Sequence, residues 1–420
     1  MPSAPAESFR FFDLPRELRD KVYRNLLCSF DPPPTSITLS EALELYRARH
    51  DNDTSILRAN STTYKEAFEV LVKTNRFVKI TSPEGLPLRM PLRGLAVPVV
   101  SEKASVVTSF KGFALSLDLS WSQPLDVRSD PVDDELFDSC TLMILHRDLN
   151  QFCLALTDGD THWPGFSDSL GLSITMAPVL DSSPKMRHAV SFEAFFSKKT
   201  QENLLAPFRT HLYGRKAVAI TGHVDKAVAA ALRDDMRRDQ WSNPAAVLSL
   251  FSTAKEDGSR LFREGKKEEG SLRWQDAALD LDKVHESSSW VNLVRRGGES
   301  FVSQLAEIYF LMRLNIAHHF LCSVQGPQPV PFACLMAEDS LTCAVKSMKK
   351  GFWMDDYKYI PSIPQAAKLR YRLALCLRLE GKAKSANGAL MHIEKALGLQ
   401  PNDAAILRER QNILAWMQRI

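Results

Sequence analysis

The segment Asn387–Pro401, NGALMHIEKALGLQP, indicates how the C-terminal half of the chain folds. Within it, Ala389 is followed by Ile393 four residues later, by Ala396 three residues beyond that, and then by Pro401. Residues spaced by three and four lie on one face of a helix. Small side chains at this spacing therefore predict a helix that packs closely against a neighbour and ends before the proline.

The same offsets recur twice towards the N-terminus. The two further sets are Ala277, Leu281 and Val284, and Ala337, Leu341 and Ala344. The helices expected just before the three sets supply small and large partners: Gly258 and Leu261, Ala317 and Phe320, and Ala374 and Leu377. Three matches predict three helical hairpins over residues 245–420, with 403–419 as a capping helix. We expect long connections inside the hairpins, at 266–272, 324–331 and 382–387.

This region resembles the tetratricopeptide (TPR) domains of heat-shock co-chaperones. AKEDGSRLFREG, Ala254–Gly265, is similar to the LKEKGN-type opening of their first motif. In MRLNIA, Met312–Ala317, an asparagine stands two residues before the small residue, as in their second motif. KLRYRLAL, Lys368–Leu375, has the lysine and arginine, four apart, of their third motif. The resemblance implies an all-α helical-repeat solenoid whose groove binds a partner protein.

The resemblance also implies the residues that grip the partner: Lys255, Ser259, Asn315, Lys368 and Arg372. In the family these positions form a carboxylate clamp for the acidic tail Glu-Glu-Val-Asp of cytosolic heat-shock chaperones. Ser259 departs from the family, which has asparagine there, so we expect it to reach a carboxylate through water. Basic residues four apart also suit an ordinary solvated helix face, and the sequence leaves this alternative open.

The N-terminal segment carries an apolar stripe. Leu14, Leu18, Val22 and Leu26 recur every four residues, which predicts an amphipathic helix. FFDLPRELRDKVYRNLL, residues 11–27, and the later stretch 56–80 resemble the F-box-like domains common in fungal proteins. That resemblance implies binding of a Skp-type adaptor through the stripe and Pro15, and hence a substrate receptor of a cullin ubiquitin ligase. The alternative is that the stripe belongs to the domain's own core.

Between these regions, short runs rich in Val, Ile, Leu and Phe predict five strands, at 77–81, 114–119, 142–146, 172–176 and 217–221. Helices are expected at 203–211 and 225–238. We therefore predict a multidomain protein. An F-box-like segment at 1–80 continues into an α+β region at 81–240, and the TPR domain follows at 245–420.

The composition argues against two classes of function, nucleic-acid binding and membrane insertion. Of 420 residues, 45% are hydrophobic and 25% charged, and 53 basic residues against 50 acidic ones give a net charge of only +3. This balance does not favour nucleic-acid binding. Seven scattered cysteines and the lack of a long apolar run predict a cytoplasmic or nuclear protein without membrane contact.

Enzyme motifs and cofactor motifs are missing from the sequence. Asp158, Asp160 and His162 lie close together, but no further ligands stand at a metal-site spacing. An Asp-Gly-Asp sequence is typical of a turn. We therefore expect no catalytic residue, no metal and no cofactor. The predicted function is a non-enzymatic interaction scaffold, with the ubiquitin-ligase receptor as the alternative.

Overall fold

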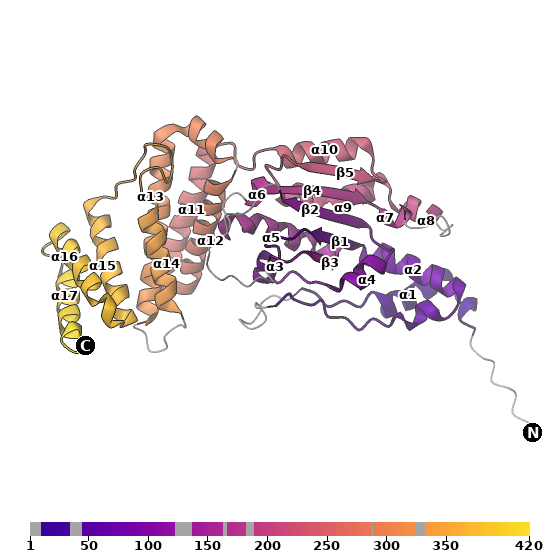
Figure 1. The fold of residues 1–420 in the computed structure, drawn as a ribbon, viewed down its shortest axis with the longest axis horizontal. Coiled ribbons are helices and arrows are strands. Elements are labelled where there is room, and N and C mark those ends of the chain that lie inside the picture. Colours follow the sequence, from indigo (N-terminus) through magenta and orange to yellow (C-terminus); the bar gives the residue numbers. More distant parts are fainter. Residues whose placement is uncertain are drawn as a thin grey trace, which may run out of the picture. The chain divides into compact units, whose positions relative to one another are not determined.

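The computed structural model describes residues 10–33, 44–121, 137–162, 166–181, 189–287, 289–324 and 332–420. The chain divides into two compact units, Met1–Gln240 and Trp241–Ile420. The first contains a mixed five-stranded sheet with helices, and the second is mostly helical (Figure 1). Among the described helices, none combines the length and the apolar character that crossing a bilayer requires.

The sheet of the first unit confirms the five predicted strands, each within two residues of its expected ends. Its order is β3-β1-β2-β4-β5 (Figure 1). The strands are β1 (Phe77–Ser82), β2 (Leu115–Trp121), β3 (Cys140–Leu145), β4 (Leu170–Met176) and β5 (Val218–Gly222). β1 runs parallel to β2, and β4 runs parallel to β5, whereas β1 with β3 and β2 with β4 are antiparallel.

Alternation along the strands gives the sheet two different faces. Val78, Leu117 and Ile174 are fully buried in the core of the unit. The strand residues that alternate with the buried ones include four polar residues that pair in register across four strands: Lys79, Ser116, Thr175 and Thr221. Successive strand residues point to opposite faces, so one face is apolar and packed while the other carries hydroxyl and amino groups.

The helices of the first unit surround this sheet. Each of the ten helices described in this unit contributes at least one apolar residue to the same core as the strands. The helices are α1 (Arg16–Leu27), α2 (Ser61–Asn75), α3 (Arg89–Gly94), α4 (Ala104–Ser109), α5 (Leu149–His162), α6 (Phe166–Ser169), α7 (Pro178–Asp181), α8 (Ala189–Phe195), α9 (Lys198–His211) and α10 (Lys226–Arg237). Short 3-10 turns lie at η1 (Phe11–Asp13), η3 (Thr54–Arg58) and η5 (His146–Asp148).

The second unit consists of three consecutive helix pairs and a last helix. α11 packs on α12, α13 on α14, and α15 on α16, while α17 packs on α16. Their bounds are α11 (Pro244–Arg263), α12 (Lys267–Glu286), α13 (Trp290–Val324), α14 (Ala333–Lys346), α15 (Ile363–Glu380), α16 (Ala386–Leu399) and α17 (Ala404–Met417), with a 3-10 turn at η6 (Ala383–Ser385). α13 is interrupted at Gly298, whose φ of 64° is not helical.

The predicted offsets explain why the pairs form. All nine residues of the three sets are buried, on α12, α14 and α16. In the first pair the helices approach so closely that a Cβ on Gly258 would lie 2.6 Å from Cδ1 of Trp274. A side chain at that position would push α11 and α12 apart, so the glycine is required by close packing.

One predicted connection is wrong. Residues 266–272 are not a loop, because α12 begins at Lys267 and only 264–266 separate it from α11. Glu268 and Glu269 lie in the first turn of α12, where acidic side chains stabilise the N-terminal end of a helix. Of the connection predicted at 382–387, residues 382–385 do separate α15 from α16 and include η6, whereas 386 and 387 already belong to α16. The third connection, 324–331, lies almost wholly outside the described residues.

The segment between α14 and α15 is packed into the unit. Trp353 is 1% exposed, and its Nε1 donates to the carbonyl of Ser347 at 2.9 Å. Trp290 Nε1 donates in turn to the carbonyl of Trp353 at 3.0 Å. His285 stacks on Phe352 with ring centroids 4.7 Å apart. This segment therefore joins α12 and α13 to the turn that follows α14.

Candidate peptide-binding face

The five residues expected to grip a partner all lie on the first helix of a pair. Lys255 and Ser259 are on α11, Asn315 is on α13, and Lys368 and Arg372 are on α15. α11 contacts α13, and α13 contacts α15, so the three helices are neighbours. We call the side chains of these helices around the five residues the basic face.

On α11, the hydroxyl of Ser259 is already engaged. Its Oγ donates to the carbonyl of Lys255 at 2.8 Å, within the same helix. The same carbonyl accepts a hydrogen bond from Trp274 Nε1 on α12 at 3.0 Å. Because a serine hydroxyl has one proton, Ser259 in this conformation has no donor left for a carboxylate.

Three of the expected residues carry available donors. The Nζ atoms of Lys255 and Lys368 and the side-chain amide of Asn315 have no hydrogen bond or ion pair within the described part of the chain. Lys368 is exposed, while Lys255 and Asn315 are partly buried. A lysine and an amide that are partly buried and unpaired can form strong hydrogen bonds to an anion without first losing another partner.

Arg372 is held between helices. Its Nη1 donates to the carbonyl of Leu314 on α13 at 2.7 Å. Burial lowers the pKa of Arg372 to about 10, which leaves the guanidinium charged at neutral pH. One of its five N–H donors is used by α13, so the group is oriented and the others remain for a ligand.

Two residues of this face were missed by the sequence analysis. His318 follows Asn315 by three residues on α13, and the positive charges of Arg372, Lys267 and Lys368 act on it. Although part of the ring faces solvent, the pKa of His318 falls to about 4, first because of desolvation and then because of these cations. His318 is therefore neutral at pH 7. The i, i+3 spacing from Asn315 indicates a shared helix face.

Lys267 was missed because its segment was assigned to a loop. As the first residue of α12 it brings another positive charge near His318. The ring of Phe262 on α11 lies 6.1 Å from that of His318, between centroids. His318 thus connects the α11 and α12 side of the face with the α15 side, and the cations around it favour an anionic ligand.

The apolar stripe of α1 differs from its predicted burial. Tyr23 and Leu27 are fully buried, whereas Leu18 is 43% exposed and Leu14, Val22 and Leu26 are partly buried. Leu26 packs against the core and Leu18 does not, so the interpretation of the stripe as core is correct only in part. Pro15 is exposed and immediately precedes α1.

Ion pairs on the other side of α1 explain this orientation. Arg19 Nη2 lies 2.7 Å from Glu66 Oε1 on α2, and Tyr23 donates to Glu66 Oε2 at 3.0 Å. Arg16 Nη2 also contacts Glu69 Oε2 at 3.1 Å. These contacts turn Tyr23 and Leu27 towards α2 and leave Leu18 at the surface.

The acidic segment considered as a metal site is helical. Asp158, Asp160 and His162 belong to α5, so the expected turn is wrong. The side chains of these three residues lie outside what the structure describes. Among the described residues there is no group of three or more His, Cys, Asp or Glu side chains that could hold a metal ion.

Comparison of the chain with known protein families, with curated proteins and with solved structures finds no match.

Proposed function

We propose that the protein is a non-enzymatic scaffold whose C-terminal unit binds the acidic C-terminal segment of a partner protein on the basic face. The observation that carries this proposal is the set of unpaired donors on adjacent helices. Lys255, Asn315 and Lys368 offer such donors, and Arg372 is oriented beside them by α13. Lysine, arginine and amide groups together match the oxygens of carboxylates.

A free C-terminus suits this arrangement better than an internal acidic side chain. A terminal aspartate presents two carboxylates a few bonds apart, and both need converging donors. The tail Glu-Glu-Val-Asp of cytosolic heat-shock chaperones has this chemistry, so we propose such a tail as the ligand. Because the hydroxyl of Ser259 is already used, the α15 residues should contribute more to affinity than the α11 residues.

The test is a binding titration of the full chain with two peptides that end in Glu-Glu-Val-Asp, one with a free carboxylate and one amidated. We expect the amidated peptide to bind at least about tenfold more weakly, because it loses a charge-assisted contact worth roughly 1.5–3 kcal/mol. Lys368→Ala should weaken binding of the free acid to a similar extent. Lys395→Ala on α16 is the matched control, because it removes an exposed lysine outside the basic face. Equal affinity for acid and amide would contradict the proposal.

A second function is favoured by the exposure of Leu18. We propose that the surface of α1 docks a Skp-type adaptor, which would make the protein a substrate receptor of a cullin ubiquitin ligase. Leu18→Asp changes a side chain that is 43% exposed, so it should leave the fold intact. Loss of a purified adaptor's binding in Leu18→Asp, but not in the exposed control Lys21→Asp, would support this function. No binding by the unmodified chain would eliminate it.

A further inference from the structure

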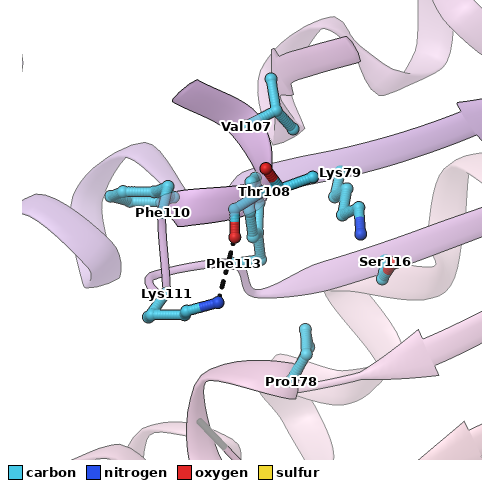
Figure 2. Close-up of a pocket in the computed structure, with 8 residues that line it drawn as sticks. All are labelled: Lys79, Val107, Thr108, Phe110, Lys111, Phe113, Ser116 and Pro178. Carbon is cyan, nitrogen blue, oxygen red and sulfur yellow. Dashed lines mark hydrogen bonds between the residues drawn. The ribbon is translucent and has the colours of Figure 1, made fainter. Parts of the chain in front are cut away.

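A cavity of about 160 Å³ lies on the polar face of the sheet, beside α4 (Figure 2). A cavity that holds one water needs roughly 10–15 Å³, so this one has room for a small molecule. It is smaller than the roughly 300–1,000 Å³ of sites for drug-sized ligands. A small head group or a single ring is the size of ligand that fits.

Its floor is formed by two neighbouring strands. Lys79 on β1 and Ser116 on β2 are partners in the parallel register, so both side chains rise from the same face of the sheet. Neither Lys79 Nζ nor Ser116 Oγ has a hydrogen bond or an ion pair within the described ranges. Both residues are partly buried. An amino group and a hydroxyl are therefore held side by side at the cavity without a protein partner.

A second amino group borders the cavity. Lys111 Nζ donates to the carbonyl of Thr108 at 3.0 Å, which fixes its position at the rim (Figure 2). Two lysines at one small cavity repel each other, and an anion between them removes that repulsion.

The remaining walls of the cavity are apolar, and backbone hydrogen bonds hold them in place. Phe110 and Phe113 pack edge to face with ring centroids 5.0 Å apart, and Pro178 lies opposite them (Figure 2). Val179 N donates to the carbonyl of Phe113 at 3.2 Å. Ala177, just before Pro178, has a φ of 53°, a conformation that non-glycine residues rarely adopt. Such conformations persist where surrounding packing holds them, as it does at this wall.

We propose that this cavity binds a small oxyanion, a carboxylate or a phosphate ester, that carries an apolar ring or chain. Lys79 and Ser116 bind the anionic oxygens, Lys111 adds a second charge, and the phenylalanine rings contact the apolar part. The proposal is independent of the basic face, which lies on the other unit.

The experiment uses the full chain and three probes of similar shape: benzoate, phenyl phosphate and the neutral benzamide. Isothermal titration should show binding of benzoate or of phenyl phosphate, and the tighter of the two identifies the preferred oxyanion. Benzamide should bind at least about tenfold more weakly than that anion. Lys79→Gln should lower the affinity for the anion by about tenfold and leave the affinity for benzamide unchanged.

The matched control is Lys65→Gln, which removes an exposed lysine from α2 and should leave all affinities unchanged. Ser116→Ala tests the hydroxyl without altering charge, and a loss of about threefold is expected. Three results would each overturn the proposal: no binding of either anion at 10 mM (roughly the limit of a useful small-ligand site), equal binding of benzamide, or unchanged anion affinity in Lys79→Gln.

Discussion

Asp148, at the end of η5, is a buried carboxylate whose removal should stabilise the first unit at neutral pH. Its side chain is fully buried, and neither carboxylate oxygen has a hydrogen-bond partner within the described residues. The opposite charge of Arg147 lies 3.6 Å from Oδ1, beyond hydrogen-bond distance. Burial raises the pKa of Asp148 from 3.8 to about 6, against the smaller opposing effect of Arg147.

The sign of the pH dependence follows from that rise. The folded chain holds the Asp148 proton more tightly than the unfolded chain does, so folding is favoured by protonation of this group. Stability is therefore lost as pH increases from about 4 to about 6, and the full cost is present above the folded pKa. A rise from 3.8 to about 6 corresponds to about 3 kcal/mol at roughly 1.4 kcal/mol per pH unit.

Asp148→Asn keeps the shape of the side chain and removes its charge. We expect the variant to be more stable than the natural chain by about 2–3 kcal/mol at pH 7.5, and by under about 0.5 kcal/mol at pH 4. Urea unfolding read by hydrogen exchange in peptides from β1 and β3 reports this unit alone. Asp234→Asn, an exposed change on α10, is the control and should shift stability little at either pH. A difference that does not change with pH would refute the reasoning, as would a less stable variant at pH 7.5.

Three further changes test packing, each read from the free energy of unfolding. Gly258→Ala should cost about 1–3 kcal/mol because its Cβ meets Trp274, whereas Gly398→Ala on α16, with open space around it, should be neutral or stabilising. An equal effect of both would exclude close packing as the cause. Glu409→Gln should cost about 3 kcal/mol, because it breaks a buried pair in which Arg378 donates to both carboxylate oxygens, at 2.5 and 3.0 Å. A neutral result would show that this pair does not hold α17 to α15. Ala177→Gly should stabilise the first unit by up to about 1 kcal/mol by relieving the positive φ, and a clear loss of stability would contradict that strain.

Patterns of small and apolar residues predicted much of the fold. The offsets of Ala277, Ala337 and Ala389 indicated three helix pairs, because close packing requires small side chains at fixed positions on a helix. The strands were found because alternation and β-branched residues distinguish a half-buried sheet. Strand order was not predictable, since it depends on contacts between segments far apart in the chain.

The misplaced loop at 266–272 has a local cause. Lysines and glutamates in KKEEGSL are typical of both a solvated loop and the first turn of a helix, and only the packing of Gly270 against α11 distinguishes the two. Because of this error, Lys267 was not among the residues predicted for the candidate site. His318 was overlooked for a different reason, because its role depends on side chains from other helices.

The sequence pattern also could not predict which side of α1 faces the core. Leu14 and Leu18 form a stripe as convincing as the one formed by Tyr23 and Leu27. The choice between them depends on Glu66 and Glu69 of α2, which bind the arginines of α1. Such pairings between helices cannot be read from periodicity within one helix.

The packed segment around Trp353 constrains how this protein can vary in length. Surface connections between helices usually tolerate added or deleted residues. Here the indole of Trp353 is inserted between α13 and the turn after α14. Its Nε1 donates a hydrogen bond, and the backbone carbonyl of Trp353 accepts another. Inserting even one residue between Ser347 and Trp353 would change the register of both bonds. We expect related chains to keep the number of residues here fixed, and to differ in length elsewhere.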